Sequence, residues 1–305
     1  MTLRATLTGG NATCVSGSRS RTYYSQLYNA YPYIRDVLTV SYEANYQGLW
    51  WNAPARSESG WGINLAHQGD VIFATWFTYD AAGNPWWLSM SANKVASNRF
   101  SGTLYQTSGP PWYASPFSAN AVKATAVGVG ALSFSDASSG VFAYTVNGIS
   151  QSKSITREVF GVLPICSFTQ TNFDFATNMQ DLWWNDPPGS EAGWGINLTH
   201  QGNVIFATWF TYNGDSTPLW FSVTANQTGP GVYSGTLYGT TGPPFNSVPF
   251  SPAAVSANVA GTATFRFSSG NSATFTNTVN ATTGPITQTK NITRQVFRSP
   301  GTLCH

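Results

Sequence analysis

A glutamate and a histidine recur at matching positions in the two halves of this chain, and such a pair could perform general acid–base chemistry. Glu58 and His67 in the first half correspond to Glu191 and His200 in the second. Each histidine lies beside a glycine turn, where its ring usually bonds a turn carbonyl. Each glutamate precedes Gly-Trp-Gly, where we expect its carboxylate to pin the loop by accepting backbone N–H groups. We therefore predict no catalytic residue, and a hydrolase using Glu58/His67 and Glu191/His200 is the second alternative.

Other signatures of chemistry are missing from the sequence. A zinc site needs three or four converging ligands, whereas each copy of the shared motif supplies one histidine and one glutamate. The chain has no Cys-x-x-Cys, no His-x-His and no Gly-x-Ser-x-Gly nucleophile motif. We predict neither a metal nor a cofactor.

Tryptophan is the most informative residue type kept in both halves. Consecutive strand residues point to opposite faces, so Trp50 and Trp51 cannot both fill one core. Exposed indoles suit sugar rings and protein partners; the alternative is that they pack on the neighbouring domain, and both interpretations stay open. The candidate ligand or partner contacts are Trp50, Trp51, Trp61, Asn64, Gln68, Trp76 and Trp87, with Trp183, Trp184, Trp194, Asn197, Gln201, Trp209 and Trp220 in the second half.

Short β-type runs separated by turn residues must position these side chains. Gly69-Asp70 and Gly202-Asn203 are typical of two-residue type II′ hairpins. Eight antiparallel strands in each half favour an all-β fold of two tandem eight-stranded up-and-down barrels, which have no sheet edges; β-sandwiches are the alternative. The strands expected in the first half are 47–52, 60–68, 71–80, 85–91, 99–106, 127–135, 141–147 and 151–160.

The strand expected at 71–80 is apolar on both faces. One face would fill a barrel. The other would meet the partner barrel, the N-terminal segment or another molecule. Left open, it would be a binding patch.

The repeat also sets the domain boundaries. We predict an N-terminal extension over 1–41 with a possible strand at 36–42, a first barrel over 42–166, a linker over 167–174 and a second barrel over 175–305. Four residues are added near the end of the second copy, around Gly284 and Pro285, as a hairpin turn would tolerate.

Composition limits the partners. Charged residues make up only 9% of the 305 residues and the net charge is +2, so we expect no nucleic-acid binding. No apolar run approaches the 18 or more residues of a membrane helix, so we expect no membrane span. We expect partners to be other copies of the chain or an extracellular protein or glycan. The N-terminus has no apolar signal segment, yet the composition is typical of secreted or cell-surface proteins.

Three cysteines, Cys14, Cys166 and Cys304, indicate a disulfide formed in an oxidising compartment. Because Cys166 ends the first copy and Cys304 the second, Cys14–Cys166 and Cys166–Cys304 are both possible and mutually exclusive. We favour Cys14–Cys166, which would leave Cys304 available to another chain; three reduced thiols are the remaining alternative.

The motifs LWWN, SESGWGINLAHQG and VIFATWFTYD, with their second copies and the endings ITREVFGVLPIC and ITRQVFRSPGTLC, resemble an uncharacterised family of secreted bacterial repeat proteins. The resemblance covers about residues 42–304. It implies secretion and a modular extracellular domain, and it carries over no catalytic residue. The strand number resembles avidin-like and lipocalin-like barrels in architecture only.

Taken together, these features predict a non-enzymatic extracellular structural or adhesive module that acts through protein–protein contacts and assembles into oligomers or filaments. A carbohydrate- or small-ligand-binding protein is the first alternative, with its site at a barrel mouth lined by Trp51, Trp61, Trp87, Asn64 and Gln68 and their second-copy partners.

Overall fold

The structure, a computed structural model, describes residues 6–8, 11–13, 44–169 and 172–305. The chain forms two compact units, Met1–Asn45 and Tyr46–His305. In the first, β1 (Thr6–Thr8) pairs with β2 (Asn11–Thr13) in an antiparallel hairpin. The strand predicted at 36–42 and the cysteine at position 14 lie outside the described residues.

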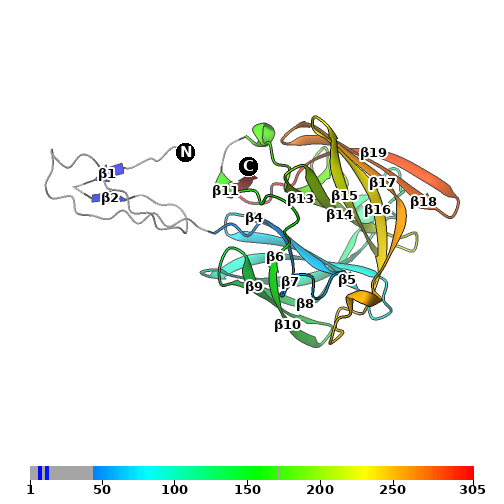
Figure 1. The fold of residues 1–305 in the computed structure, drawn as a ribbon, viewed down its shortest axis with the longest axis horizontal. Coiled ribbons are helices and arrows are strands. Elements are labelled where there is room, and N and C mark those ends of the chain that lie inside the picture. Colours follow the sequence, from blue (N-terminus) through cyan, green and yellow to red (C-terminus); the bar gives the residue numbers. More distant parts are fainter. Residues whose placement is uncertain (1–5, 9–10, 14–43, 170–171) are drawn as a thin grey trace. The chain divides into compact units, whose positions relative to one another are not determined.

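The second unit contains two closed eight-stranded barrels, which confirms the predicted fold class (Figure 1). All strands of each barrel pair antiparallel with their sequence neighbours, and the last pairs with the first. Barrel 1 consists of β3 (Gly48–Asn52), β4 (Gly62–Gln68), β5 (Val71–Tyr79), β6 (Pro85–Ala96), β7 (Arg99–Ser108), β8 (Lys123–Phe134), β9 (Ser139–Val146) and β10 (Ile149–Arg157). Barrel 2 consists of β12 (Asp181–Asn185), β13 (Gly195–Gln201), β14 (Val204–Tyr212), β15 (Pro218–Gly229), β16 (Val232–Thr241), β17 (Ser256–Ser269), β18 (Ser272–Ala281) and β19 (Gly284–Arg294).

The tight hairpins follow from glycine. Gly69 and Gly202 have φ values of 55° and 61°, a region that costs glycine little because it has no Cβ. The residues after them, Asp70 and Asn203, keep negative φ, as a type II′ turn requires. Each turn therefore joins adjacent strands without splaying them.

Large side chains fill both barrels. Ile63, Trp76 and Leu88 are Cα partners on β4, β5 and β6, and all three are at most 1% exposed. Trp76 packs edge-on against Phe142 across the interior, with ring centroids 5.2 Å apart. Such rows of aromatic and branched side chains leave the barrels as packed cores.

A small two-stranded sheet pairs the segment after barrel 1 with the C-terminal segment after barrel 2. β11 (Cys166–Thr169) pairs with β20 (Gly301–Cys304), and Cys166 is disulfide-bonded to Cys304. The preference for Cys14–Cys166 was therefore wrong. Sequence could not decide, because both pairings bracket one repeat; β11 and β20 place the two cysteines directly opposite each other.

Three short 3-10 turns, η2 (Ala119–Ala121), η3 (Phe173–Phe175) and η4 (Pro252–Ala254), complete the described elements. The four added residues of the second copy lengthen the β18–β19 hairpin, which projects at the right of Figure 1.

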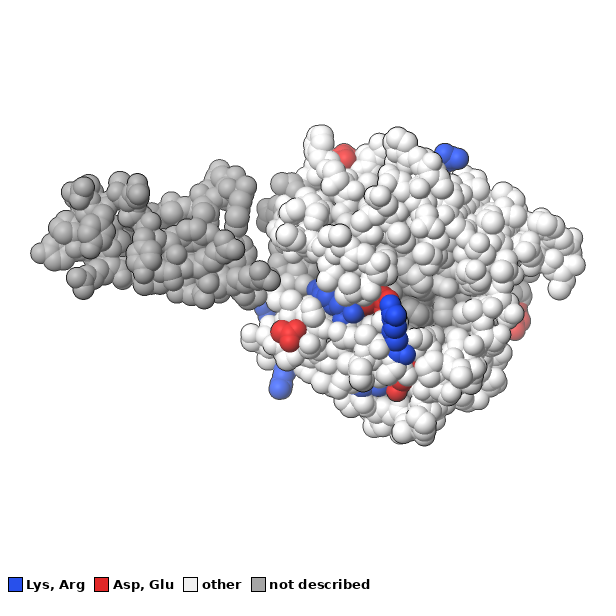
Figure 2. Space-filling model, viewed as in Figure 1, with Lys and Arg blue, Asp and Glu red and all other residues white. Residues whose placement is uncertain are grey.

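Few charged side chains appear on the face shown in Figure 2. In the described part of the chain, no helix is long and apolar enough to cross a membrane.

Candidate functional site

The outer face of β4–β6 packs against the same face of β13–β15. Asn64 Nδ2 donates to Thr208 Oγ1 over 3.1 Å, and Asn197 Nδ2 donates to Thr75 Oγ1 over 3.2 Å. These four residues are equivalent in the two copies, so the interface is self-complementary about an approximate two-fold axis, as in an isologous dimer. The second apolar face of the strand expected at 71–80 is therefore covered by the partner barrel.

Two tryptophans anchor this interface. Trp87 Nε1 donates to the carbonyl oxygen of Thr211, and Trp220 Nε1 donates to that of Thr78, each over 3.0 Å. The Trp220 ring lies 5.0 Å from that of Phe77. Because both indoles are desolvated and hydrogen-bonded, they are unavailable to a sugar or an external partner in this arrangement.

Two glutamines join each barrel to the tail of the other. Gln68 Oε1 accepts the backbone N–H groups of Phe297 and Arg298, and Gln68 Nε2 donates to the carbonyl of Gln295. Gln201 makes the same three bonds with Phe160, Gly161 and Glu158. A single amide that satisfies three backbone groups is hard to replace, which explains why both copies keep glutamine here.

Each barrel also closes one end of the other. The loop after β16 places Phe245 beside Trp76 and Tyr144 of barrel 1. The backbone N–H of Phe245 donates to the carbonyl oxygen of Tyr79. Reciprocally, the loop after β7 places Trp112 beside Trp209 of barrel 2. These exchanged plug loops mean that neither barrel presents an open mouth at this end.

Gly60 allows a close approach between the barrels. Its φ is 125°, and a Cβ there would lie 2.5 Å from Val255 Cγ2 in the partner barrel. Gly193 has the same relation to Val122. The first glycine of each Gly-Trp-Gly therefore serves inter-barrel packing.

We predict that Gly60→Ala lowers the free energy of unfolding by about 2–3 kcal/mol, from backbone strain plus overpacking. Chemical denaturation measures it. Gly284→Ala is the matched control, because its φ of 111° is similar but no atom lies within 4 Å of the added Cβ; it should cost only the backbone strain, about 1–2 kcal/mol. Equal losses in the two variants would contradict the packing role.

Glu58 and Glu191 hold their loops through side chains. Glu58 Oε2 accepts from Trp61 Nε1 over 2.9 Å and from Lys153 Nζ over 2.6 Å. Glu191 does the same with Trp194 and Lys290. The expected backbone N–H donors are replaced by an indole and an ammonium group.

The two histidines are built into the barrel ends. His67 Nδ1 accepts the Tyr46 backbone N–H over 3.1 Å, and His200 Nδ1 accepts that of Met179 over 3.0 Å. Burial, reinforced by the charge of Lys94, lowers the pKa of His67 to about 3. The seven residues of β4 separate this histidine from the Glu58 loop by roughly 20 Å. Glutamate and histidine therefore do not form a joint catalytic site.

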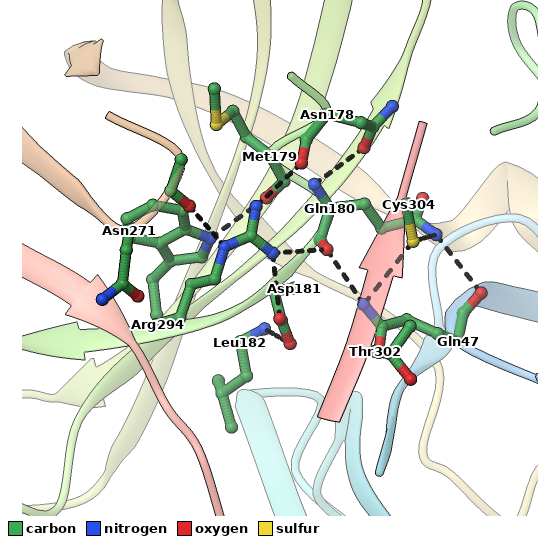
Figure 3. Close-up of polar contacts among 12 residues, drawn as sticks. Gln47, Asn178, Met179, Gln180, Asp181, Leu182, Asn271, Arg294, Thr302 and Cys304 are labelled. Carbon is green, nitrogen blue, oxygen red and sulfur yellow. Dashed lines mark hydrogen bonds and ion pairs between the residues drawn. The ribbon is translucent and has the colours of Figure 1, made fainter. Parts of the chain in front are cut away.

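Around the disulfide, two glutamines tie the repeats together, and an arginine forms bonds within the second repeat (Figure 3). Gln47 Nε2 donates to the carbonyl of Gln180 over 2.9 Å, and Gln180 Nε2 donates back to that of Gln47 over 3.3 Å. Arg294 forms a buried ion pair with Asp181 at 2.9 Å. Burial raises the pKa of Asp181, although Arg294 opposes the shift. The position of Asp181 is Gly48 in the first copy, so this ion pair is particular to barrel 2.

Glu158 has no ionisable equivalent in the second copy, where Gln295 stands at the same position. Burial raises the pKa of Glu158 from 4.5 to about 7, and its Oε2 has no partner among the described residues. The folded protein therefore binds the proton more tightly than the unfolded chain does. The protonated Glu158 therefore contributes to the free energy of unfolding below pH 4.5, and this contribution is lost as the pH rises through 7.

We predict that Glu158→Gln raises the free energy of unfolding at pH 8 by about 1–2 kcal/mol, discounted for partial exposure, and has little effect at pH 4. Urea denaturation across this range measures the difference. Gln295→Glu is the matched control, and it should introduce the same pH dependence in barrel 2. An unchanged pH profile in both variants would contradict the account.

The remaining predicted contact residues divide between interior and periphery. Trp50 and Trp183 are fully buried and donate to backbone carbonyls, while Trp51 and Trp184 on the opposite face are half-buried. Trp76 and Trp209 are interior. The set predicted to line one mouth is not gathered there: Trp51 is half-buried on β3, Trp61 bonds the Glu58 loop, and Trp87, Asn64 and Gln68 lie at the interface.

Sequence reasoning missed a hollow on the outside of barrel 1. It has a volume of about 820 Å³ and lies over β7–β10. Its lining is entirely uncharged: Ser101, Gly102, Thr103, Val129, Gly130, Ala131, Ala143, Tyr144, Thr145, Ser150, Gln151 and Ser152. The signal was the drift between copies, because Val129, Ala131 and Ala143 become threonines in the second copy.

The described residues contain no group of three or more side chains that could hold a metal ion.

The two closed barrels and the interface between them define a tandem β-barrel protein whose two repeats pack as an internal pseudo-dimer. Comparison with family models, with curated proteins and with solved structures gives no match to this chain.

Proposed function

We propose that this protein is a non-enzymatic extracellular structural or adhesive module that acts through protein–protein contacts and associates with copies of itself. The observation that carries the proposal is where the repeated chemistry lies. Most polar and aromatic residues kept in both copies lie inside the barrels, between them or in loop contacts, whereas Tyr105 and its equivalent Tyr238 are exposed. What the barrels offer to a partner is an outer surface with few charges, made mostly of hydroxyl and aliphatic side chains.

Two further features support this function. The Cys166–Cys304 disulfide is typical of proteins that work in oxidising compartments. Large aliphatic side chains are exposed on the outer sheets, including Val129 at 58% and Val259 at 63%. A surface with few charges and exposed aliphatic groups favours association over solubility.

The alternatives have weaker support. The tryptophans and amides expected at one barrel mouth for a carbohydrate are not gathered there, and Trp87, Asn64 and Gln68 bond across the interface. The acid–base pair expected for a hydrolase is split between opposite ends of β4.

Sedimentation velocity on the full chain, from micromolar to millimolar concentration and with or without reductant, tests the proposal. We expect concentration-dependent association in the oxidised protein. A strict monomer over the whole range in both conditions would overturn self-association.

A further inference from the structure

Two of the differences between the barrels change the shape of their outer surfaces. Barrel 1 carries the 820 Å³ hollow over β7–β10. Barrel 2 carries the lengthened β18–β19 hairpin, in which β18 and β19 have 10 and 11 residues against 8 and 9 for β9 and β10. One copy thus has a concave site and the other a projection.

The hollow is made by small side chains in two rows across four strands. Ser101, Ala131, Ala143 and Ser152 are successive Cα partners, as are Thr103, Val129, Thr145 and Ser150. In barrel 2 the three central aliphatic residues become Thr262, Thr264 and Thr276, and Thr276 bonds the hydroxyl of Thr289 over 2.9 Å. The hollow therefore combines an aliphatic floor with hydroxyl groups at both sides, without any charge.

The hairpin tip has matching chemistry. Residues 280–285 read Asn-Ala-Thr-Thr-Gly-Pro, with no charge and no large side chain. Asn280, Thr282, Thr283 and Pro285 are exposed, and no atom lies within 4 Å of a Cβ placed at Gly284. The hairpin projects away from the barrel in Figure 1.

We propose that the β18–β19 hairpin tip of one molecule docks into the β7–β10 hollow of a second copy. The proposal deepens, and rests on, the self-association proposed above. Hollow and hairpin are different surfaces, so the contact is heterologous, and each molecule in a chain keeps one free hollow and one free hairpin. Repetition without ring closure builds a filament.

Two variants block the two sides separately. The first replaces residues 280–285 with Asn-Gly, the turn of the β9–β10 hairpin, where Asn147 and Gly148 both have positive φ and form a favoured two-residue turn. Val279 and Ile286 are already Cα partners, so the shortened strands keep their register. The second variant, Ala131→Arg with Ala143→Arg, fills and charges the hollow. Thr264→Arg with Thr276→Arg, at the equivalent place on barrel 2, is its matched control.

Sedimentation velocity and electron microscopy on the full chain test the contact. We expect each blocking variant alone to associate at least tenfold more weakly than the unmodified protein, and the control to associate normally. An equimolar mixture of the two blocking variants should form a 1:1 complex that does not grow, because one supplies only a hollow and the other only a hairpin. Undiminished association of either blocking variant, with its barrel circular dichroism intact, would overturn the docking mode but leave self-association standing. A monomeric unmodified protein would overturn both.

Discussion

Replacing Trp220 with alanine is expected to lower the free energy of unfolding by about 3–5 kcal/mol. The ring is 2% exposed, contacts Phe77 and Tyr79 of the other barrel, and donates to the Thr78 carbonyl. Truncation removes this area and leaves a buried carbonyl without its donor. Chemical denaturation of the full chain measures the loss.

The pseudo-two-fold relation between the barrels also predicts how the loss of stability in Trp220→Ala compares with that of other tryptophan variants. Trp87→Ala should cost about as much as Trp220→Ala, because the two indoles make equivalent contacts. The double variant should cost less than the sum, since Trp220 packs on Phe77, Trp87 packs on Phe210, and these two phenylalanines contact each other. Trp184→Ala, at a half-buried position outside the interface, should cost clearly less. A loss for Trp220→Ala no greater than for Trp184→Ala would show that the barrels do not depend on this contact.

Removing the disulfide is expected to have the second large effect. Cys166 and Cys304 are 138 residues apart, and the chain-entropy relation gives up to about 5 kcal/mol for a loop of this length. Cys166→Ser with Cys304→Ser should therefore lower the midpoint of urea denaturation strongly, and reductant should do the same to the unmodified protein.

Cys14→Ser is the control for this prediction, because it should leave stability unchanged. Thiol titration of the oxidised, denatured protein should find a single free thiol. A loss of stability in Cys14→Ser comparable to that of the double variant would contradict the Cys166–Cys304 pairing.

The fold was predictable from sequence because its signals are local. Glycine-first turns, period-two alternation from Trp61 to His67 and the duplication itself specify eight sequential antiparallel strands in each copy. The pairing of cysteines was not predictable, since two exclusive bonds satisfied the same spacing.

The site was harder to predict, because the decisive contacts are between copies. Asn64 faces Thr208, a residue 144 positions away, and no local pattern relates them. The repeated residues do carry one usable signal. A polar set kept in both copies without convergent catalytic groups is what a self-complementary interface requires, since every residue on one side must find its own equivalent across the axis. The hollow gave no motif, because it is formed by small side chains.

Hydrogen exchange of the tryptophan indole N–H groups, followed by NMR on the full chain, tests the internal pseudo-dimer most directly. Trp87 and Trp220 lie on the outside of their own barrels, so only the partner barrel can protect them. We predict that both indoles exchange as slowly as those of the interior Trp50 and Trp183. Exchange of Trp87 and Trp220 at the rate of a solvent-exposed indole, with Trp50 and Trp183 protected, would contradict the interface and the functional account built on it.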